Sequence, residues 1–367
     1  DIKNKKKNLN VLDKNFKLNF KIKDLNKFKK FKKIAIIGMG GSILGSEAIY
    51  FFLKDKIKKD IYFFDDLDPK KNLLFKKKEK PSEILFIIIS KSGNTVETIS
   101  NFLSLNIIKK NSKNLIIISE RSNNSLFLIS KKFNLFYIEH KKNIGGRYSV
   151  LSEVGIIPAY LMGLNIKKIR SSSSSILSGK KKLFLKDSTV KLANLFNNQK
   201  IKNLIFLNYA PELKNLLLWC QQLIAESLGK QKKGFLPTIS TAPRDHHSLL
   251  QLYLDGPRDK LFYIFSTEFK SEEKVDSKKI FNSKHFLNKK SLYKIKNAQK
   301  EALIKTLKNN NIPFREFKIK KTNEISIGEL FSYFILETII IGKLVKINPF
   351  DQPAVEQVKV LTKQSLT

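Results

Sequence analysis

The chain has 367 residues, 42% of them hydrophobic, which is enough to form the cores of two globular domains. The formal net charge of +38 would suggest a nucleic-acid-binding protein, but the lysines are spread through every segment, so we expect no specific nucleic-acid partner. The apolar runs are far shorter than the roughly 20 residues of a membrane-spanning helix, and a single cysteine, Cys220, excludes an intrachain disulfide and a multi-cysteine metal site.

The first ten residues are rich in Lys and Asn and contain no apolar core region, so we expect no secretory signal and a cytoplasmic protein. The lysine excess occurs together with abundant Asn, Ile and Phe, which is the residue set that AT-rich codons encode. We therefore interpret the positive charge mainly as mutational drift of solvent-exposed positions towards residues that AT-rich codons encode. Polyanion binding stays open as a side activity, and strong salt dependence without any effect of sugars would reveal it.

Short apolar runs alternate with helical stretches in both halves of the chain, which is typical of parallel sheets covered by helices and predicts an α/β fold. The expected strands are residues 34–37, 61–64, 84–89, 115–118, 136–138, 204–208, 261–265 and 314–319. In the second half the expected helices are residues 212–228, 292–308 and 327–345, and the polar segment 267–290 is expected to be a surface loop.

A run of serines at residues 171–175 follows a helix-like stretch at 156–162 and is the best candidate for a linker. It places a domain boundary between residues 165 and 190. We predict a first domain at residues 1–170, a second at 171–345 and a carboxy-terminal segment at 346–367.

The first motif is a glycine turn, Gly38-Met39-Gly40-Gly41-Ser42, directly after the strand expected at 34–37. Glycines permit a tight turn and a close backbone approach, Ser42 can cap the helix that follows, and free amides at a helix start attract anions. A dinucleotide fingerprint would need a third glycine at the position of Ile43, which disfavours NAD. A turn needed only for packing stays an alternative.

The second motif, Ser90-Lys91-Ser92-Gly93-Asn94-Thr95, directly follows the strand expected at 84–89. It gathers hydroxyls, an ammonium group and a helix start in one turn, and these are the donors that a phosphate monoester requires. The loop lacks the Gly-Lys-Ser/Thr ending of a nucleotide P-loop, which disfavours ATP. Helix capping alone is the competing interpretation of the hydroxyls.

Acid, base and electrophile candidates lie in three further segments. Gln222 and Glu226 are four residues apart and share a helix face, although a helix Glu is more often solvated than catalytic. Arg147 lies on a glycine-rich turn, where its guanidinium can face an anionic intermediate or make a structural ion pair. His246 and His247 point to different faces of an expected helix, so they are a poor metal pair and we expect no bound metal.

Together with the stretch from Asn348 to Lys359, these motifs resemble, in order and spacing, those of the glucose-6-phosphate isomerase family, the aldose–ketose isomerases of glycolysis and gluconeogenesis. The resemblance extends from Gly38 to Lys359. It implies two sugar-isomerase (SIS) domains, each with a doubly wound, flavodoxin-like parallel sheet, followed by a carboxy-terminal helix. It also implies a cofactor-free interconversion of glucose 6-phosphate and fructose 6-phosphate through a cis-enediol intermediate.

The resemblance also implies roles for individual residues. Glu226 resembles the base that moves a proton between C1 and C2, and Arg147 resembles the group that stabilises the enediolate. His247 resembles the ring-opening histidine, which the family takes from the neighbouring subunit, so a homodimer is implied. Lys359 resembles the lysine that assists ring opening. The residues that resemble substrate-contacting groups are Gly41, Ser42, Ser90, Lys91, Ser92, Thr95, Gln222 and Gln352.

Two other functions stay open. A dual phosphoglucose and phosphomannose isomerase would differ in its tolerance of the epimer at C2. A sugar-phosphate sensor with the same architecture would keep the phosphate loop but need not keep Glu226, Arg147, His247 and Lys359 together. Such a sensor usually also carries a DNA-binding module, for which the first thirty residues are short. Residues 241–245 also replace the glycine-bearing approach to the histidine that many family members have.

Overall fold

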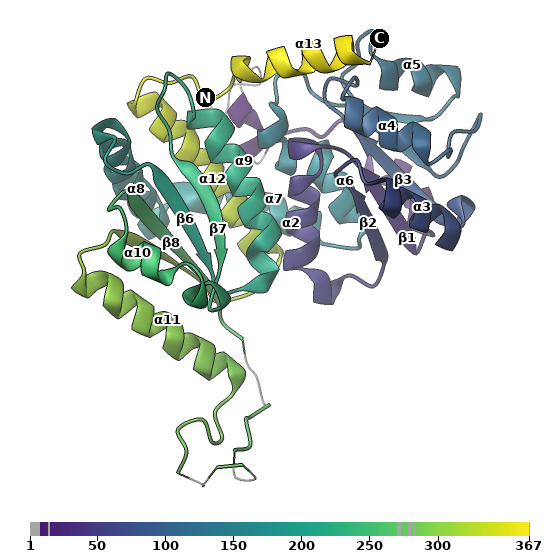
Figure 1. Cartoon of the computed structure of the whole chain (residues 1–367). Coiled ribbons are helices and arrows are strands. Elements are labelled where there is room, and N and C mark those ends of the chain that lie inside the picture. The colour runs from purple at the N-terminus through teal and green to yellow at the C-terminus, as the bar shows by residue number, and fades with distance from the viewer. Residues whose placement is uncertain (1–7, 14, 270–272, 278–279, 282–283, 367) are drawn as a thin grey trace.

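The computed structural model describes residues 8–13, 15–269, 273–277, 280–281 and 284–366. The expectation that the first ten residues are not a secretory signal falls mostly outside this described part. Two parallel sheets lie in two lobes with helices between and around them (Figure 1). The predicted α/β fold class is thereby confirmed.

The first sheet contains five parallel strands in the order β2-β1-β3-β4-β5. All residues of the central strands β3 and β4 are buried, as expected for a parallel sheet covered on both faces. The strands are β1 (Lys33–Ile37), β2 (Asp60–Phe64), β3 (Ile84–Ile89), β4 (Leu115–Ser119) and β5 (Phe136–Glu139). All five strands expected in this half of the chain are therefore confirmed.

The second sheet contains four parallel strands in the order β7-β6-β8-β9. These strands are β6 (Asn203–Asn208), β7 (Leu236–Thr241), β8 (Lys260–Thr267) and β9 (Phe314–Ile319). In both sheets the second strand along the chain pairs with the outer side of the first, and the third strand pairs with its other side. That is the flavodoxin-like doubly wound order, which the resemblance implied.

Strand β7 is absent from the sequence-based prediction. It is an edge strand with the sequence Leu-Pro-Thr-Ile-Ser-Thr. Proline and hydroxyl side chains interrupt this sequence, so it lacks the continuous apolar run that identifies a buried strand. Its edge position explains why a proline is tolerated there.

One apolar core joins the two facing sheet surfaces through a layer of helices, mainly α2, α6, α9 and α12. The outer surface of the first sheet is covered by α3, α4 and α5, and that of the second by α10 and α11. The helices are α1 (Ile22–Leu25), α2 (Leu44–Phe52), α3 (Pro69–Lys78), α4 (Val96–Ser104), α5 (Ser125–Lys132), α6 (Glu153–Leu161), α7 (Ile166–Ser171), α8 (Gly179–Asn198), α9 (Lys214–Leu228), α10 (Leu250–Asp255), α11 (Leu292–Asn309), α12 (Glu324–Leu344) and α13 (Glu356–Ser365).

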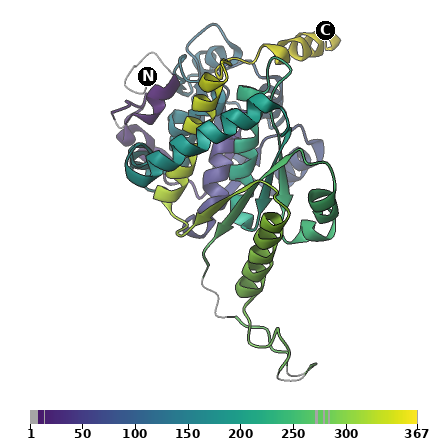
Figure 2. The ribbon, with the colours of Figure 1, turned by 90° about the vertical axis from the view of Figure 1, so that its left-hand side faces the viewer.

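Helix α12 is the one described helix long and apolar enough to span a membrane, but 78% of its apolar window is buried. It packs against α7, α8 and α9. The described residues of the segment expected to be a surface loop form no helix or strand between β8 and α11. Figure 2 shows this segment extending away from the second sheet.

The serine run at residues 171–175 is not an exposed linker. Ser171 ends α7, and the rest of the run belongs to a 3-10 helix, Ser172–Leu177, in which Ser172 and Ser173 are buried. The Ser172 hydroxyl donates to the carbonyl of Ile169 (2.6 Å) and packs against Gly328 of α12. The low-complexity run was expected to be a linker, but small hydroxyl side chains that bond to their own backbone allow close helix packing instead. The domain bounds derived from it stay a prediction.

Candidate active site

The candidate site lies at the carboxyl ends of β1 and β3, where the strand order of the first sheet reverses. Open α/β sheets bind ligands at such a switch point. The glycine turn follows β1 and the hydroxyl-rich loop follows β3, and a Cβ on Gly38 would lie 3.1 Å from the carbonyl oxygen of Ile89. The two loops predicted to bind an anionic sugar are therefore neighbours.

The hydroxyls of the second loop bond within the loop rather than to the helix that follows. Ser90 and Thr95 share a hydrogen bond of 2.8 Å between their hydroxyl oxygens, and the amide of Gly93 donates to Ser90 Oγ (3.2 Å). Thr95 is the residue before α4, but its side chain accepts no amide of that helix. The capping interpretation of Ser90 and Thr95 therefore lacks support, and both hydroxyls lie beside the free amides at the start of α4.

Gly93 fixes the shape of this loop. Its φ is +67°, in the left-handed region, and a Cβ there would lie 1.8 Å from Asn124 Oδ1. Lys91 extends toward Glu120, with 3.5 Å between the ammonium nitrogen and the carboxylate oxygen.

The glycine turn forms a short 3-10 helix, Gly40–Ser42, which lies against the second lobe. A Cβ on Gly40 would lie 2.7 Å from Gln222 Nε2, and a Cβ on Gly41 would lie 2.4 Å from the carbonyl carbon of Gly146. Ser42 does not cap α2, because Ile43 precedes that helix and no side-chain cap bond is formed. The capping role expected of Ser42 was wrong, and the turn instead brings bare backbone against the segment that carries Arg147.

Arg147 and Glu226 are in direct contact. Arg147 Nη1 donates to Glu226 Oε2 (3.1 Å), and Gln222 Nε2 donates to Glu226 Oε1 (2.9 Å), so each carboxylate oxygen has one donor. The guanidinium is buried, whereas 33% of the Glu226 side chain is exposed. Gln222 and Glu226 lie four residues apart on α9, so they share one helix face, as predicted. The arrangement holds a partly accessible carboxylate beside a buried cation.

The side-chain oxygen of Gln222 is buried and has no hydrogen-bond partner in the described part of the chain. A buried acceptor without a partner is costly, and one at a candidate site can accept a ligand hydroxyl. The Gln222 amide nitrogen thus holds Glu226, while its side-chain oxygen has no partner among the described residues.

Arg147 also binds the carboxy-terminal segment. Its Nη2 donates to the carbonyls of Pro349 (2.6 Å) and Asp351 (3.1 Å), and its Nη1 donates to Gln352 Oε1 (2.7 Å). The remaining donor, Nε, bonds to Ser227 Oγ (2.8 Å). The ion pair with Glu226 is therefore one of several interactions, and the predicted alternative of a structural ion pair describes part of its surroundings.

Three of these neighbours had no predicted role. Ser227 and Tyr148 are buried, their hydroxyls lie 2.7 Å apart, and Tyr148 donates to the Pro349 carbonyl (2.7 Å). Lys230 reaches the same carboxy-terminal segment. The only available signal was position, because each lies within four residues of Arg147 or Glu226 in the sequence.

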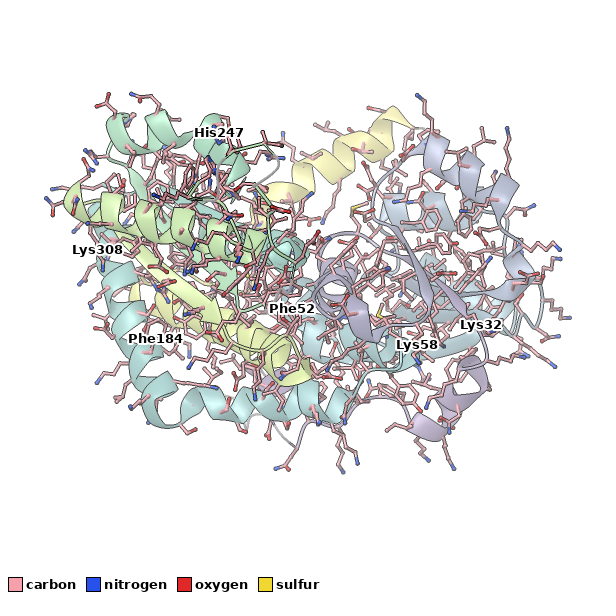
Figure 3. The ribbon with its side chains drawn as sticks, turned by 90° about the horizontal axis from the view of Figure 1, so that it is seen from below. Lys32, Phe52, Lys58, Phe184, His247 and Lys308 are labelled. Atoms are coloured by element: carbon pink, nitrogen blue, oxygen red, sulfur yellow. The ribbon has the colours of Figure 1, made fainter. Side chains whose placement is uncertain are left out.

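His247 lies far from Glu226 within the same chain. It is exposed, on the 3-10 helix Arg244–His247, and Figure 3 shows it toward the edge of the molecule. The adjacent His246 shares a hydrogen bond (2.6 Å, Nε2 to Oη) with Tyr209, which precedes α9, whereas Glu226 lies twelve residues beyond the first residue of α9. At 1.5 Å per residue, about 18 Å of helix separates the two ends. The helix expected to start at His246 starts at Leu250 instead.

Lys359 is also outside the cluster around Arg147. It lies on α13, whose described residues are all exposed, and its ammonium group pairs with Glu356 (2.7 Å). Figure 1 shows α13 crossing above both lobes. The structure therefore brings Arg147, Glu226, Gln222 and Gln352 together and leaves His247 and Lys359 apart from them.

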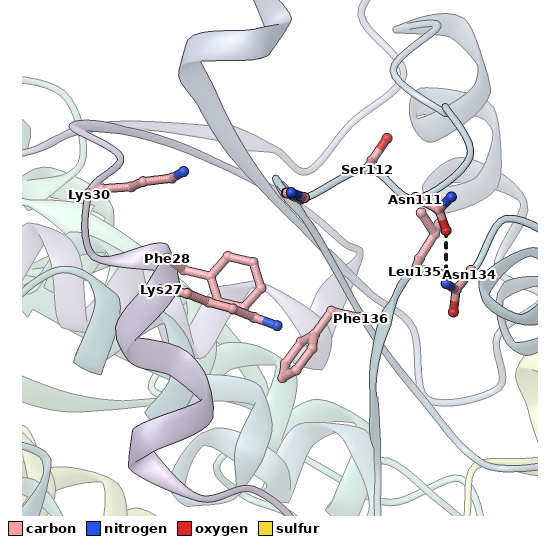
Figure 4. Close-up of a pocket in the computed structure, with 9 residues that line it drawn as sticks. Lys27, Phe28, Lys30, Asn111, Ser112, Asn134, Leu135 and Phe136 are labelled. Carbon is pink, nitrogen blue, oxygen red and sulfur yellow. Dashed lines mark hydrogen bonds between the residues drawn. The ribbon is translucent and has the colours of Figure 1, made fainter.

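A separate cavity of about 580 Å³ lies at the opposite edge of the first sheet. Its lining includes Ser112, just before β4, and Phe136, the first residue of β5, so it opens at the amino ends of these strands. Figure 4 shows Lys27 beside the rings of Phe28 and Phe136 there, with its ammonium nitrogen 4.3 Å from the centre of the Phe136 ring. Because the predicted sugar-phosphate loops are at the carboxyl ends, this cavity is not part of the candidate active site.

Two doubly wound sheets, with a hydroxyl-rich loop and a glycine turn at a switch point, define the α/β sugar-isomerase class of fold. Solved structures support this class. A hypothetical protein from Thermus thermophilus superimposes with a TM-score of 0.81 at 24% identity, covering 94% of this chain and 88% of that one. A glucose-6-phosphate isomerase from Chlamydia trachomatis gives a TM-score of 0.74 at 19% identity, covering 93% and 71%.

A family model described as phosphoglucose isomerase matches residues 14–367, and the chain belongs to that family. Among curated relatives, a probable glucose-6-phosphate isomerase from Methanococcus maripaludis is 34% identical over 94% of this chain and 81% of its own length. The resemblance recognised in the motifs is thus confirmed at the level of the family.

Proposed function

We propose that the protein interconverts glucose 6-phosphate and fructose 6-phosphate, in glycolysis and gluconeogenesis, in the cytoplasm. Family membership and the names of the relatives support this reaction. The observation that carries it is the carboxylate of Glu226, held between the Arg147 guanidinium and the Gln222 amide, because the reaction requires one base beside one cation.

In the open-chain aldose, Glu226 takes the proton from C2 while the carbonyl oxygen on C1 gains a proton, which gives the enediol. The carboxylic acid then returns a proton to C1, and the hydroxyl on C2 loses its proton to become the ketone carbonyl. No redox partner is required, since hydrogen only moves between two carbons. The buried Arg147 guanidinium stabilises the negative charge that develops on the enediolate oxygens.

We assign the phosphate group of the substrate to the loop that follows the carboxyl end of β3. Ser90, Lys91, Ser92 and Thr95 hold the phosphate in this proposal, and the free amides at the start of α4 add to the attraction for an anion. Gly41, Ser42, Gln222 and Gln352 contact the sugar. The spacing of the two loops at one switch point supports a single phosphorylated ligand across them.

Ring opening is assigned to His247 and Lys359. His246, next to His247, bonds to Tyr209 before the amino end of α9, and about 18 Å of that helix lies between this end and Glu226. In this proposal the histidine that serves one site therefore comes from a second copy of the chain, and the protein acts as a homodimer. The exposure of His247 supports this assignment. In this proposal Lys359 reaches the sugar when α13 lies over the two loops.

The test is a coupled assay with purified protein and fructose 6-phosphate, in which glucose 6-phosphate formation is read through its dehydrogenase. Glu226→Gln keeps the shape and removes the base, so we expect turnover in the parent, nearly none in this variant, and retained binding of an open-chain phosphorylated sugar acid. Glu329→Gln, a change in α12 where the carboxylate contacts Ser175 and Lys181, is the matched control and should keep parental turnover.

Binding of phosphorylated sugars without turnover in the parent would contradict the proposal and indicate a sensor. Equal loss of turnover and analogue binding in Glu226→Gln would contradict the base assignment. Mannose 6-phosphate, supplied in the same assay, separates a single-substrate isomerase from a dual one.

A further inference from the structure

The chain leaves the body of the protein through residues 348–352, between α12 and α13. Arg147 and Tyr148 bind carbonyl groups of this segment from one side. Beyond Gln352, every described residue up to 366 is exposed. The segment is therefore the last point at which the chain is fixed before the helix that carries Lys359.

Lys230 binds the same segment from the other side. Its ammonium group donates to Asp351 Oδ1 (2.6 Å) and to the carbonyl oxygen of Asn348. The second carboxylate oxygen of Asp351 accepts from Asn348 Nδ2 (2.9 Å), and the amide of Phe350 donates to Asn348 Oδ1 (3.1 Å). One ammonium group thus closes a small ring of bonds around the turn.

Only the lysine side of this ion pair is shielded from solvent. The Lys230 side chain is 15% exposed, while that of Asp351 is 55% exposed. The hydrogen bond from Lys230 lowers the pKa of Asp351, so the carboxylate stays ionised as the solution becomes more acidic.

Lys230 and Asp351 each lie close in sequence to a residue of the candidate site. Lys230 lies four residues after Glu226 and two after the end of α9, and Asp351 lies directly before Gln352, whose amide oxygen meets Arg147. The pair therefore ties the end of the helix that carries the proposed base to the segment that carries Gln352 and leads into α13.

We propose that Lys230 and Asp351 are positioning residues that fix the Gln352 carboxamide against Arg147 and set the point from which α13 extends. The proposal rests on the proposed isomerase function for its effect on turnover, but its structural part does not. Neither residue is assigned contact with the sugar. Their loss acts through misplacement of Gln352 and Lys359, and a displacement of about 1 Å can cost about 100-fold in rate.

The experiment compares Lys230→Met, Asp351→Asn and the double variant with the parent. Lys33→Met is the matched control, because Lys33 makes an ion pair of the same length with Glu79 (2.6 Å) at the amino end of β1, away from the candidate site. Asp351→Asn removes the charge from a largely exposed side chain without changing its size, so it keeps the fold even if Lys230→Met does not.

We expect each single variant to lower kcat by about 10- to 100-fold. The double variant should be no slower than the slower single one, because both changes remove the same bond. Lys230→Arg should restore most of the rate, and Lys33→Met should keep the parental kcat.

Amide hydrogen exchange of residues 348–352 provides a readout independent of turnover. Exchange should be faster in Lys230→Met and Asp351→Asn than in the parent and in Lys33→Met. Unchanged exchange, a parental kcat in both single variants, or additive losses in the double variant would each overturn the proposal. A parent without turnover would overturn the proposed function, and exchange alone would then decide the structural part.

Discussion

Gly41 and Gly146 lie so close together in the first lobe that a Cβ on Gly41 would lie 2.4 Å from the carbonyl carbon of Gly146. The Gly146 side of this contact is open, because a Cβ there would meet nothing within 4 Å. The contact joins the glycine turn of the first lobe to the turn that carries Arg147. An added methyl group should therefore clash at Gly41 and be tolerated at Gly146.

We predict that Gly41→Ala lowers the free energy of unfolding by about 1–3 kcal/mol, because backbone must move to admit the methyl group. Gly146→Ala should change it by less than about 0.5 kcal/mol. Urea unfolding followed by circular dichroism measures both. Equal destabilisation by the two variants would show that the close approach of the two backbones is not maintained in solution.

Lys359 supplies a second prediction. If it assists ring opening, Lys359→Ala should slow turnover of the cyclic substrate more than that of an open-chain analogue. Lys363→Ala, one turn further along α13, is the matched control, and it should affect neither substrate. Both side chains are exposed, so the melting temperatures should match that of the parent. Steady-state kinetics with the two substrates make the comparison, and equal losses with both would argue against a role in ring opening.

Thr95 tests the phosphate loop. Thr95→Val removes the hydroxyl that bonds to Ser90 but keeps the side-chain shape, so we expect KM for the phosphorylated sugar to rise by about 10-fold, as the loss of one hydrogen bond to a charged group predicts. Inorganic phosphate should also become a weaker competitive inhibitor.

The control for Thr95 lies on the helix that follows. The hydroxyl of Thr98 is buried and has no partner in the described residues, so Thr98→Val should leave KM unchanged and keep or improve stability. If both valine variants changed KM alike, the loop would be acting through the packing of α4 rather than through its hydroxyls.

Glu47 predicts a pH dependence of stability. Burial raises the pKa of Glu47 to about 7, and the nearby carboxylate of Asp65 adds to the rise, while Asn215 and Lys71 oppose it. The unfolded chain releases this proton near pH 4.5, whereas the folded chain keeps it until about pH 7. The contribution of Glu47 to stability is therefore present below pH 4.5 and lost as the pH rises to about 7.

Glu47→Gln keeps the shape and cannot ionise, so its stability relative to the parent should increase between pH 5 and pH 8, by roughly 1–3 kcal/mol. Parallel urea titrations of the two proteins at several pH values measure this difference, and other titrating groups cancel in the comparison. A difference that stays constant with pH would mean that Glu47 ionises in the folded protein as it does in the unfolded chain.

Most of the fold could be predicted from sequence because parallel strands buried on both faces are continuous apolar runs, as at β3 and β4. Strand β7 escaped prediction because an edge strand exposes one side and tolerates proline. The serine run was wrongly interpreted as a linker, because composition cannot show that the Ser172 hydroxyl will bond to the backbone of its own helix and pack against Gly328.

The candidate site was predictable where a motif is local. The bonds among Ser90, Gly93 and Thr95 lie within one turn, and Gln222 and Glu226 are separated by one helical turn. The bonds of Arg147 to Ser227 and to the carboxy-terminal segment depend on how the two lobes meet, which no local spacing encodes. The roles of the individual residues stay predictions until the variants are measured.

The bonds of Arg147 to Pro349 and Gln352 span 202 and 205 residues of sequence, so they form late when the chain is synthesised from its amino end. The last strand ends at Ile319, so both sheets are synthesised before the carboxy-terminal partners of Arg147, which are Pro349, Asp351 and Gln352. A nascent or prematurely terminated chain can therefore have a folded body and yet leave this guanidinium incompletely bonded. In a cell, turnover of the sugar phosphate would report that translation had passed Gln352.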